Sequence, residues 1–298
     1  MKTEKISLYQ TRDFGEVLNI SFAFIGKHYR LLGIAFLQWC LPFVLLNTLS
    51  NTLILDNLYA WLNEISYSPE RVFEIYTAVY SFKMFIFSLL ALFINLLLVA
   101  VVMLIIFRIF QLELDECEEI SLKTISDNLF KGLFKLIFTQ IFFFFMIALG
   151  LVLFILPGLY WSFLLLLLPI VRYFEPETTL WQGYQRCQAL YRNESKFSWK
   201  KYFQTVGLVV ILSIIGFSAS AFLATIYQTL GYNPLESKNL TSNQSSAWWI
   251  IAITTFISQI ANTLMAFLTY TVLTFQYFNL VEQIDSKSVV KEIEQFGK

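Results

Sequence analysis

Two apolar runs, separated by the pair Pro157-Gly158, most strongly limit what this chain can fold into. The first run, residues 136–156, contains no charged side chain, and the second, residues 159–174, contains only Arg172. About 20 consecutive apolar residues in an α-helix cross the hydrocarbon core of a bilayer, which is about 30 Å thick. Proline followed by glycine is typical of a turn between two elements. The stretch therefore predicts two membrane-spanning helices joined by a tight reversal at Pro157-Gly158.

The composition extends this prediction to the rest of the chain. Of the 298 residues, 57% are hydrophobic and only 14% are charged, whereas charged residues make up about 25% of an ordinary soluble domain. A soluble chain of this length cannot bury so much apolar surface, so lipid must be the solvent for much of it. We expect an all-α, polytopic integral membrane protein with a single membrane domain, residues 1–298. The predicted spans are residues 31–55, 82–110, 136–156, 159–174, 203–230 and 248–280, followed by a tail, residues 281–298.

Three polar segments with helical periodicity each precede a pair of spans: residues 13–29, 121–135 and 178–192. In the first, Asp13 and Glu16 have the spacing of a capping box, and apolar residues recur every three or four positions. We expect these helices to lie along the membrane surface, with docking to a partner as the alternative for the first. The pattern also suggests three similar units, beginning near Asp13, Ser121 and Thr178. The apolar faces of the first and third helices would contain Phe14, Leu18, Phe22, Ile25 and Tyr29, and Leu180, Tyr184, Cys187 and Tyr191, respectively.

The distribution of basic residues predicts the orientation. With the N-terminus in the cytoplasm, 18 of the 21 lysines and arginines fall in cytoplasmic segments, and only Arg71, Lys83 and Lys238 fall outside. Cytoplasmic loops carry the excess of lysine and arginine in multi-pass proteins. We therefore expect both termini and all three surface helices to be cytoplasmic.

The sequence offers little material for catalysis. His28 is the only histidine, and no motif for a nucleophile, a phosphate loop or a zinc site is present. An acidic patch could in principle bind a divalent cation, but it matches no calcium loop, and a solvated helix start explains it better. We expect no enzyme, no metal, no cofactor and, with a net charge of zero, no nucleic-acid partner. The patch consists of Glu113, Asp115, Glu116, Glu118 and Glu119.

The interiors of the predicted spans contain no aspartate, glutamate or histidine, and their polar residues are amides and hydroxyls. Interhelical hydrogen bonds are the simplest role for such residues. A path for a small solute or a lipid is the alternative, lined by Asn95, Gln140, Gln259 and Asn262. Pro169 should bend the fourth span, and a broken helix of this kind can also line a substrate site. A cytoplasmic surface for a protein partner or for lipid headgroups is predicted at Arg186, Arg192, Lys200 and Lys201.

A motif of about 50 residues around the predicted hairpin contains Leu156, Pro157, Gly158, Pro169, Glu175, Gly183, Arg186, Cys187 and Leu190. It resembles a pattern in a loose group of bacterial six-span proteins that includes the membrane domain attached to some glycerophosphoryl diester phosphodiesterases. Gly183 and Cys187 stand where the group usually has alanine and serine. The start of the chain is similar to uncharacterised membrane proteins of the Bacteroidetes type. The resemblance implies a fold and a location in the bacterial inner membrane but no phosphodiesterase activity, because the soluble catalytic barrel is absent.

From these observations we expect a non-enzymatic protein of the inner membrane that acts as a scaffold or accessory subunit of a membrane process. Membrane lipid is the expected surrounding, and a protein partner would bind at the cytoplasmic helices. A permease or lipid-handling protein with an amide-lined path is the alternative.

Overall fold

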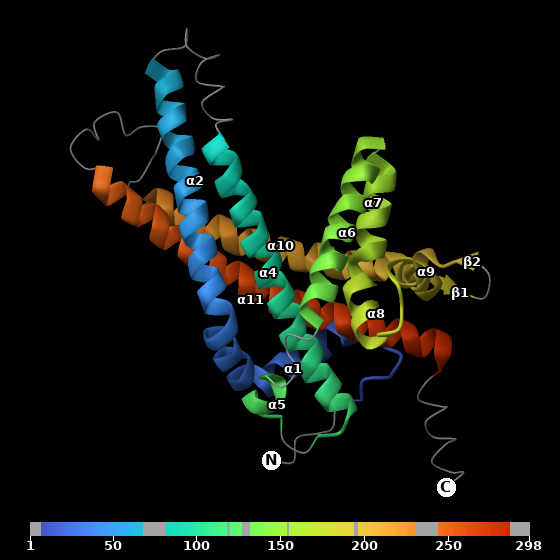
Figure 1. Ribbon diagram of the computed structural model, residues 1–298. Helices are drawn as coiled ribbons and strands as arrows, with labels where there is room; N and C mark the ends of the chain where they lie inside the picture. Colours follow the sequence, from blue (N-terminus) through green and yellow to red (C-terminus); the bar gives the residue numbers. More distant parts are fainter. Residues whose placement is uncertain are drawn as a thin grey trace. The chain divides into compact units, whose positions relative to one another are not determined.

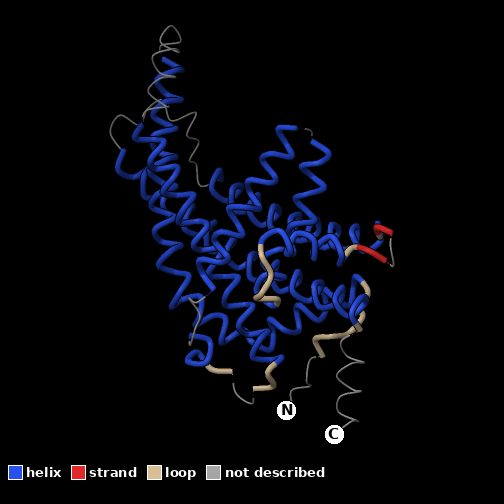
Figure 2. Tube along the Cα trace, turned by 45° about the vertical axis from the view of Figure 1, so that its right-hand side comes forward, coloured by secondary structure: helices blue, strands red, loops and turns tan. Residues whose placement is uncertain are grey.

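The computed structural model of the chain is shown in Figure 1 and describes residues 7–67, 82–117, 120–126, 132–153, 155–193, 196–229 and 244–286. Helices make up almost all of these residues, as the tube in Figure 2 shows. The strands of the described chain form one short antiparallel hairpin, in which β1 (Arg192–Asn193) pairs with β2 (Lys196–Phe197). The protein is therefore all-α, as the sequence predicts.

Twelve helical segments follow one another along the described chain. They are α1 (Phe14–Ala35), the π-helix η1 (Phe36–Cys40), α2 (Leu41–Tyr67), α4 (Phe82–Leu114), α5 (Leu122–Ser126), α6 (Leu133–Leu153), α7 (Ile155–Leu164), the 3₁₀-helix η4 (Leu165–Leu167), α8 (Leu168–Phe174), α9 (Leu180–Leu190), α10 (Trp199–Thr229) and α11 (Gln244–Asp285). Six stretches of the described chain are long and apolar enough to cross a membrane: Phe14–Leu55, Phe85–Leu114, Leu133–Val152, Pro157–Phe174, Trp199–Ser218 and Ile251–Asp285. This confirms the prediction of six such helices.

The first surface helix and the first span are continuous in the structure. The predicted capping box is confirmed, because the Asp13 backbone N donates to Glu16 Oε2 at 2.9 Å and the Glu16 backbone N donates to Asp13 Oδ1 at 2.8 Å. The helix that begins there does not stop at residue 29 but runs through the π-helical turn η1 into α2. A π-turn inserts extra backbone without ending a helix, so a surface helix and a span become one element.

The predicted reversal at Pro157-Gly158 is wrong in position. Both residues lie in the first turn of α7, which begins at Ile155, whereas α6 ends at Leu153. Proline is tolerated in a first turn because its missing N–H has no partner there. Gly158 serves close packing instead, since a Cβ added at Gly150 of α6 would lie 2.7 Å from the Gly158 Cα. Helices of membrane proteins approach this closely where small residues face each other.

The other predicted boundaries shift by smaller amounts. Of the predicted helix 121–135, α5 covers Leu122–Ser126, residues 127–131 lie outside the described part, and α6 already begins at Leu133. The third predicted surface helix corresponds to α9, which begins with a capping box of Thr179 and Gln182. In the predicted tail, α11 continues to Asp285, and residues 287–298 lie outside the described part.

The chain divides into two compact units. The first unit comprises the described residues of Met1–Ala35, Ala100–Ser213 and Ala266–Lys298, and the second those of Phe36–Val99 and Ile214–Met265. Both α4 and α11 therefore contribute one half to each unit.

The core of the first unit forms around the halves of α4 and α11 that belong to it. Residues 271–282 of α11 are all buried, and residues 100–112 of α4 are buried apart from Arg108 and Gln111. Phe24 of α1 stacks on Phe110 of α4 with ring centroids 4.3 Å apart, and Phe275 of α11 meets Phe110 edge-on at 4.9 Å. Burying one such side chain contributes about 1.5–3 kcal/mol. These aromatic contacts hold α1, α4 and α11 together.

The face of α1 that packs in this unit is not the apolar face seen in the sequence. Val17, Ser21, Phe24 and His28 are buried, whereas the predicted face is exposed at Phe22 and Tyr29. In a membrane the outer surface is solvated by lipid, so the more apolar face of a helix can point outward. The position of α1 along the membrane surface stays a prediction.

Candidate functional site

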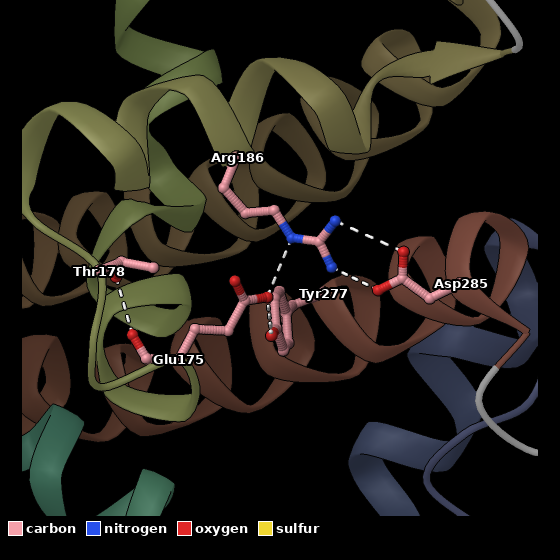
Figure 3. A network of polar contacts seen from close by, with 5 residues as sticks. All are labelled: Glu175, Thr178, Arg186, Tyr277 and Asp285. Carbon is pink, nitrogen blue, oxygen red and sulfur yellow. Dashed lines mark hydrogen bonds and ion pairs between the residues drawn. The ribbon is translucent and has the colours of Figure 1, made fainter. Parts of the chain in front are cut away.

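One group of charged side chains in the first unit joins α9 to α11. Arg186 of α9 lies between two carboxylates, as Figure 3 shows. Its Nε donates to Glu175 Oε1 at 3.0 Å, and its Nη1 and Nη2 donate to the two carboxylate oxygens of Asp285 at the end of α11. The Tyr277 hydroxyl donates to the same Glu175 oxygen at 3.0 Å. We call Glu175, Arg186, Tyr277 and Asp285 the arginine network.

Local sequence positions the residues of this network. Glu175 ends α8, and its carbonyl accepts hydrogen bonds from the backbone N and the hydroxyl of Thr178, which fixes the turn into α9. Gly183 lets α9 lie close to α8, because an added Cβ would lie 2.9 Å from Leu168 Cδ1. Burial lowers the pKa of Arg186, but its hydrogen bonds to Asp285 and Glu175 outweigh burial and raise the pKa above its ordinary value. Arg186 is thus a permanent cation that joins α8, α9 and α11.

The network accounts for several residues of the motif noted in the sequence. Glu175 and Arg186 are ion-pair partners, Gly183 permits the close contact of α8 and α9, and Cys187 and Leu190 are buried on the inner face of α9. Burial also raises the pKa of Cys187, so its thiol is protonated at neutral pH and is a poor nucleophile. The predicted surface role of Arg186 stays a prediction, and its charge is engaged within the chain.

A second cluster joins α1 to α4. Lys27 Nζ and His28 Nε2 lie 2.6 Å and 2.9 Å, respectively, from Glu113 Oε1. One carboxylate of the predicted acidic patch is therefore an internal ion-pair partner. Glu116 follows in a left-handed conformation with φ 53° just after α4 ends. Among the described residues no group of three histidine, cysteine or acidic side chains is placed to hold a metal, and Glu118 and Glu119 lie outside that part.

A third group lines a pocket of about 950 Å³ where the start of α1, the start of α10 and the end of α11 meet. Lys200 and Lys201, two of the predicted surface cations, line it together with the carboxylates of Asp13 and Glu282. Its volume is within the usual range for a small-molecule site, roughly 300–1,000 Å³. The lining residues are Thr11, Arg12, Asp13, Phe14, Ser198, Lys200, Lys201, Gln204, Glu282, Gln283 and Ser286.

The cations of this pocket are held in different ways. Lys201 is only 9% exposed, and its Nζ donates to the Arg192 carbonyl at 3.2 Å. Arg12 is 8% exposed, and its guanidinium donates to the carbonyl oxygens of Ser7, Leu8 and Gln10. Lys200 is exposed. Within the described part of the chain, no ion pair joins any of these three cations to a carboxylate.

The four amides predicted to line a path do not bind one another. Gln140, in the first unit, is buried and donates to the sulfur of Met103 at 3.7 Å. In the second unit, Gln259 Oε1 accepts from Asn47 Nδ2 at 3.2 Å, whereas Asn95 and Asn262 are exposed. The amide cluster present in the second unit is Asn47, Asn51 and Gln259, because Asn51 also donates to the side chain of Asn47 at 2.9 Å. The sequence did not indicate Asn47 as part of this cluster, because no local pattern pairs it with Gln259.

Comparisons with protein-family models, with curated proteins and with solved structures found no match. The resemblance to the bacterial six-span group therefore stays a prediction from the motif.

Proposed function

We propose that this protein is a non-enzymatic scaffold or accessory subunit of a membrane process in the bacterial inner membrane, with both termini in the cytoplasm. The observation that carries the proposal is the use of charge in the first unit. Charged groups at membrane depth usually mark a transport path or a proton relay. Here Arg186, Glu175 and Asp285 bind one another, as do Lys27, His28 and Glu113, and both groups fasten helices of one unit.

The same unit supplies a surface on which a partner could dock. Arg192 and Lys196 lie on the β1-β2 hairpin with exposed side chains, next to α9 in the sequence. In the proposed orientation this hairpin belongs to the cytoplasmic face. We assign the partner contact to this hairpin, since Arg186 is already engaged in the arginine network.

The second candidate is a permease or lipid-handling protein that uses the amide cluster. The observation in its favour is the group of Asn47, Asn51 and Gln259, which brings polar side chains of α2 and α11 together inside predicted spans. Amide pairs of this kind contribute about 0.6 kcal/mol to helix association in a membrane. Structural pairing is thus sufficient to explain the cluster without a substrate.

Two measurements on purified protein separate these candidates. The scaffold proposal expects a stoichiometric partner to co-purify with the wild type and to be lost when Arg192→Glu and Lys196→Glu are combined, whereas Lys123→Glu on α5 retains it. It also expects protein in liposomes to move neither solute nor lipid. Transport that Asn47→Leu or Asn262→Leu abolishes in a folded protein would reject the scaffold and support the permease.

A further inference from the structure

We propose that the pocket between α1, α10 and α11 binds the headgroup of a membrane phospholipid that carries both a phosphate and a primary ammonium, the phosphoethanolamine type. The inference stands apart from the scaffold proposal because it concerns a different surface. It rests on four features of the pocket: its two buried cations, the polarity of its helix ends, its carboxylates and the apolar surface beside it.

The buried cations come first. Lys201 and Arg12 line the pocket as residues that are 9% and 8% exposed, and neither forms an ion pair with a carboxylate within the described chain. A buried charge without an opposite charge is costly. Arg12 compensates through backbone carbonyls and through the face of Phe275, whose centroid lies 5.6 Å from its Cζ. The Lys201 ammonium has three donor hydrogens and one carbonyl partner. We therefore expect it to donate to a phosphate oxygen of the ligand.

The start of α10 adds to the positive side of the pocket. Ser198, Lys200 and Lys201 all belong to the start of this helix and line the pocket. The first backbone N–H groups of an α-helix have no partner within the helix, and they favour an anion such as phosphate. With the ammonium groups of Lys200 and Lys201, this end of α10 provides several donors for one phosphodiester.

The negative side of the pocket is formed by the end of α11 and by the N-cap of α1. Glu282 and Gln283 come from the last turn of α11, where carbonyl groups carry the negative end of the helix dipole. The Asp13 carboxylate lines the pocket as well. A purely anionic headgroup would gain from the lysines but would be repelled by these carboxylates. A headgroup with an ammonium beyond its phosphate has charges that complement both sides.

The apolar surface beside the pocket identifies the ligand as a lipid rather than a free headgroup. Trp199 and Phe203 follow one turn apart on α10, are 57% and 59% exposed, and stack with ring centroids 5.7 Å apart. Val210 continues the same exposed face further along the helix. Aromatic side chains are typical of the boundary between headgroups and acyl chains. A lipid with its headgroup in the pocket would lay its acyl chains along this face.

The test is native mass spectrometry of the purified full-length protein titrated with phosphatidylethanolamine, phosphatidylglycerol and phosphatidylcholine, each in detergent. Wild-type protein should bind one phosphatidylethanolamine about fivefold more tightly than either of the other two, the effect of roughly one additional charge contact. Equal or tighter binding of phosphatidylglycerol would overturn the proposal. Free phosphoethanolamine that competes as well as the whole lipid would also overturn it, since the ligand would then be a soluble headgroup.

Variants assign each side of the pocket. Lys200→Gln combined with Lys201→Gln should weaken all three lipids, whereas Glu282→Gln should weaken phosphatidylethanolamine alone. Lys201→Arg, which keeps the charge, should retain binding, and Lys123→Gln on the exposed surface of α5 is the matched control. If the double lysine variant does not fold, Lys200→Gln alone tests the contact with the phosphate, because the Lys200 side chain is exposed. Loss of lipid in Lys123→Gln equal to that in Lys200→Gln would reject the site.

Discussion

The two units surround the same helices, α4 and α11, in different ways. In the first unit the α4 residues Phe107 and Phe110 are fully buried, whereas in the second unit Phe85 and Phe93 of the same helix are exposed. Both halves of α4 are made mostly of apolar residues. The difference shows that other side chains of the protein cover one half of α4. The exposed apolar side chains of the other half need lipid or a partner to cover them.

The polar contacts between helices also differ between the two units. In the first unit ion pairs join helices, as at Arg186 with Asp285 and at Lys27 with Glu113. In the second unit the described contact between helices is an amide pair, Asn47 with Gln259. Charges are costly in hydrocarbon but acceptable near headgroups and inside a packed unit. Around α4 and α11, the first unit thus has features of a folded protein core, and the second has those of a lipid-solvated bundle.

We expect the two units to differ most in stability when one glycine of each is changed to alanine. Gly150→Ala places a Cβ 2.7 Å from the Gly158 Cα, so α6 and α7 must separate, at a cost of about 2–3 kcal/mol. Gly216→Ala in the second unit meets only Met265, at 3.8 Å, and should be neutral or stabilising by up to ~1 kcal/mol. Thermal unfolding midpoints in detergent would measure both. Equal losses at the two glycines would remove the distinction between a tight and a loose unit.

The arginine network gives the next largest effect. Arg186→Ala leaves Glu175 and Asp285 without their cation, and because these side chains are about a quarter exposed, we expect a loss of roughly 1–2 kcal/mol rather than the larger value of a fully buried pair. A double-mutant cycle with Asp285→Asn measures the coupling. Arg192→Ala, an exposed arginine nearby in the sequence, is the control and should change stability by less than ~0.5 kcal/mol. Additive losses at Arg186 and Asp285 would show that the pair contributes nothing.

The amide pair of the second unit should give the smallest effect. Asn47→Leu removes the hydrogen bond to Gln259 and should cost about 0.6 kcal/mol, the mean for such bonds between membrane helices. The same unfolding assay, with Asn95→Leu at an exposed position as the control, measures it. A loss as large as that of Arg186→Ala would mean that the second unit also depends on polar contacts.

Helix positions could be predicted from the sequence because each depends on local properties. Long apolar runs predict spans, and the spacing of Asp13 and Glu16 predicts a helix start. The reversal at Pro157-Gly158 was misplaced because proline and glycine fit a first helical turn and a close helix contact as well as they fit a turn. The buried face of α1 was not apparent either, since in lipid the more apolar face need not point inward.

The polar sites were harder to predict because their members are distant in sequence. Arg186 and Glu175 were identified from the motif, but Tyr277 and Asp285 come from another helix, with Asp285 99 residues beyond Arg186. Lys200 and Lys201 were identified as a basic surface, whereas Arg12 and Glu282 contribute to the same pocket only through the packing of α1 and α11. No local pattern indicates such tertiary pairings.

The contact between the two ends of the described chain has a consequence for the order of biosynthesis. The Arg12 backbone N donates to Asn279 Oδ1 at 2.9 Å, and Asn279 Nδ2 donates to the Arg12 carbonyl at 3.0 Å, across 267 residues. The N-terminal segment leaves the ribosome first, but its partner on α11 is made close to the end of translation. Contacts so distant in sequence form late and slowly. Before α11 is made, α1 can contact α4 through Phe24 and Phe110 but cannot contact α11. A nascent chain that stops before α11 is complete therefore leaves part of the inner face of α1 uncovered.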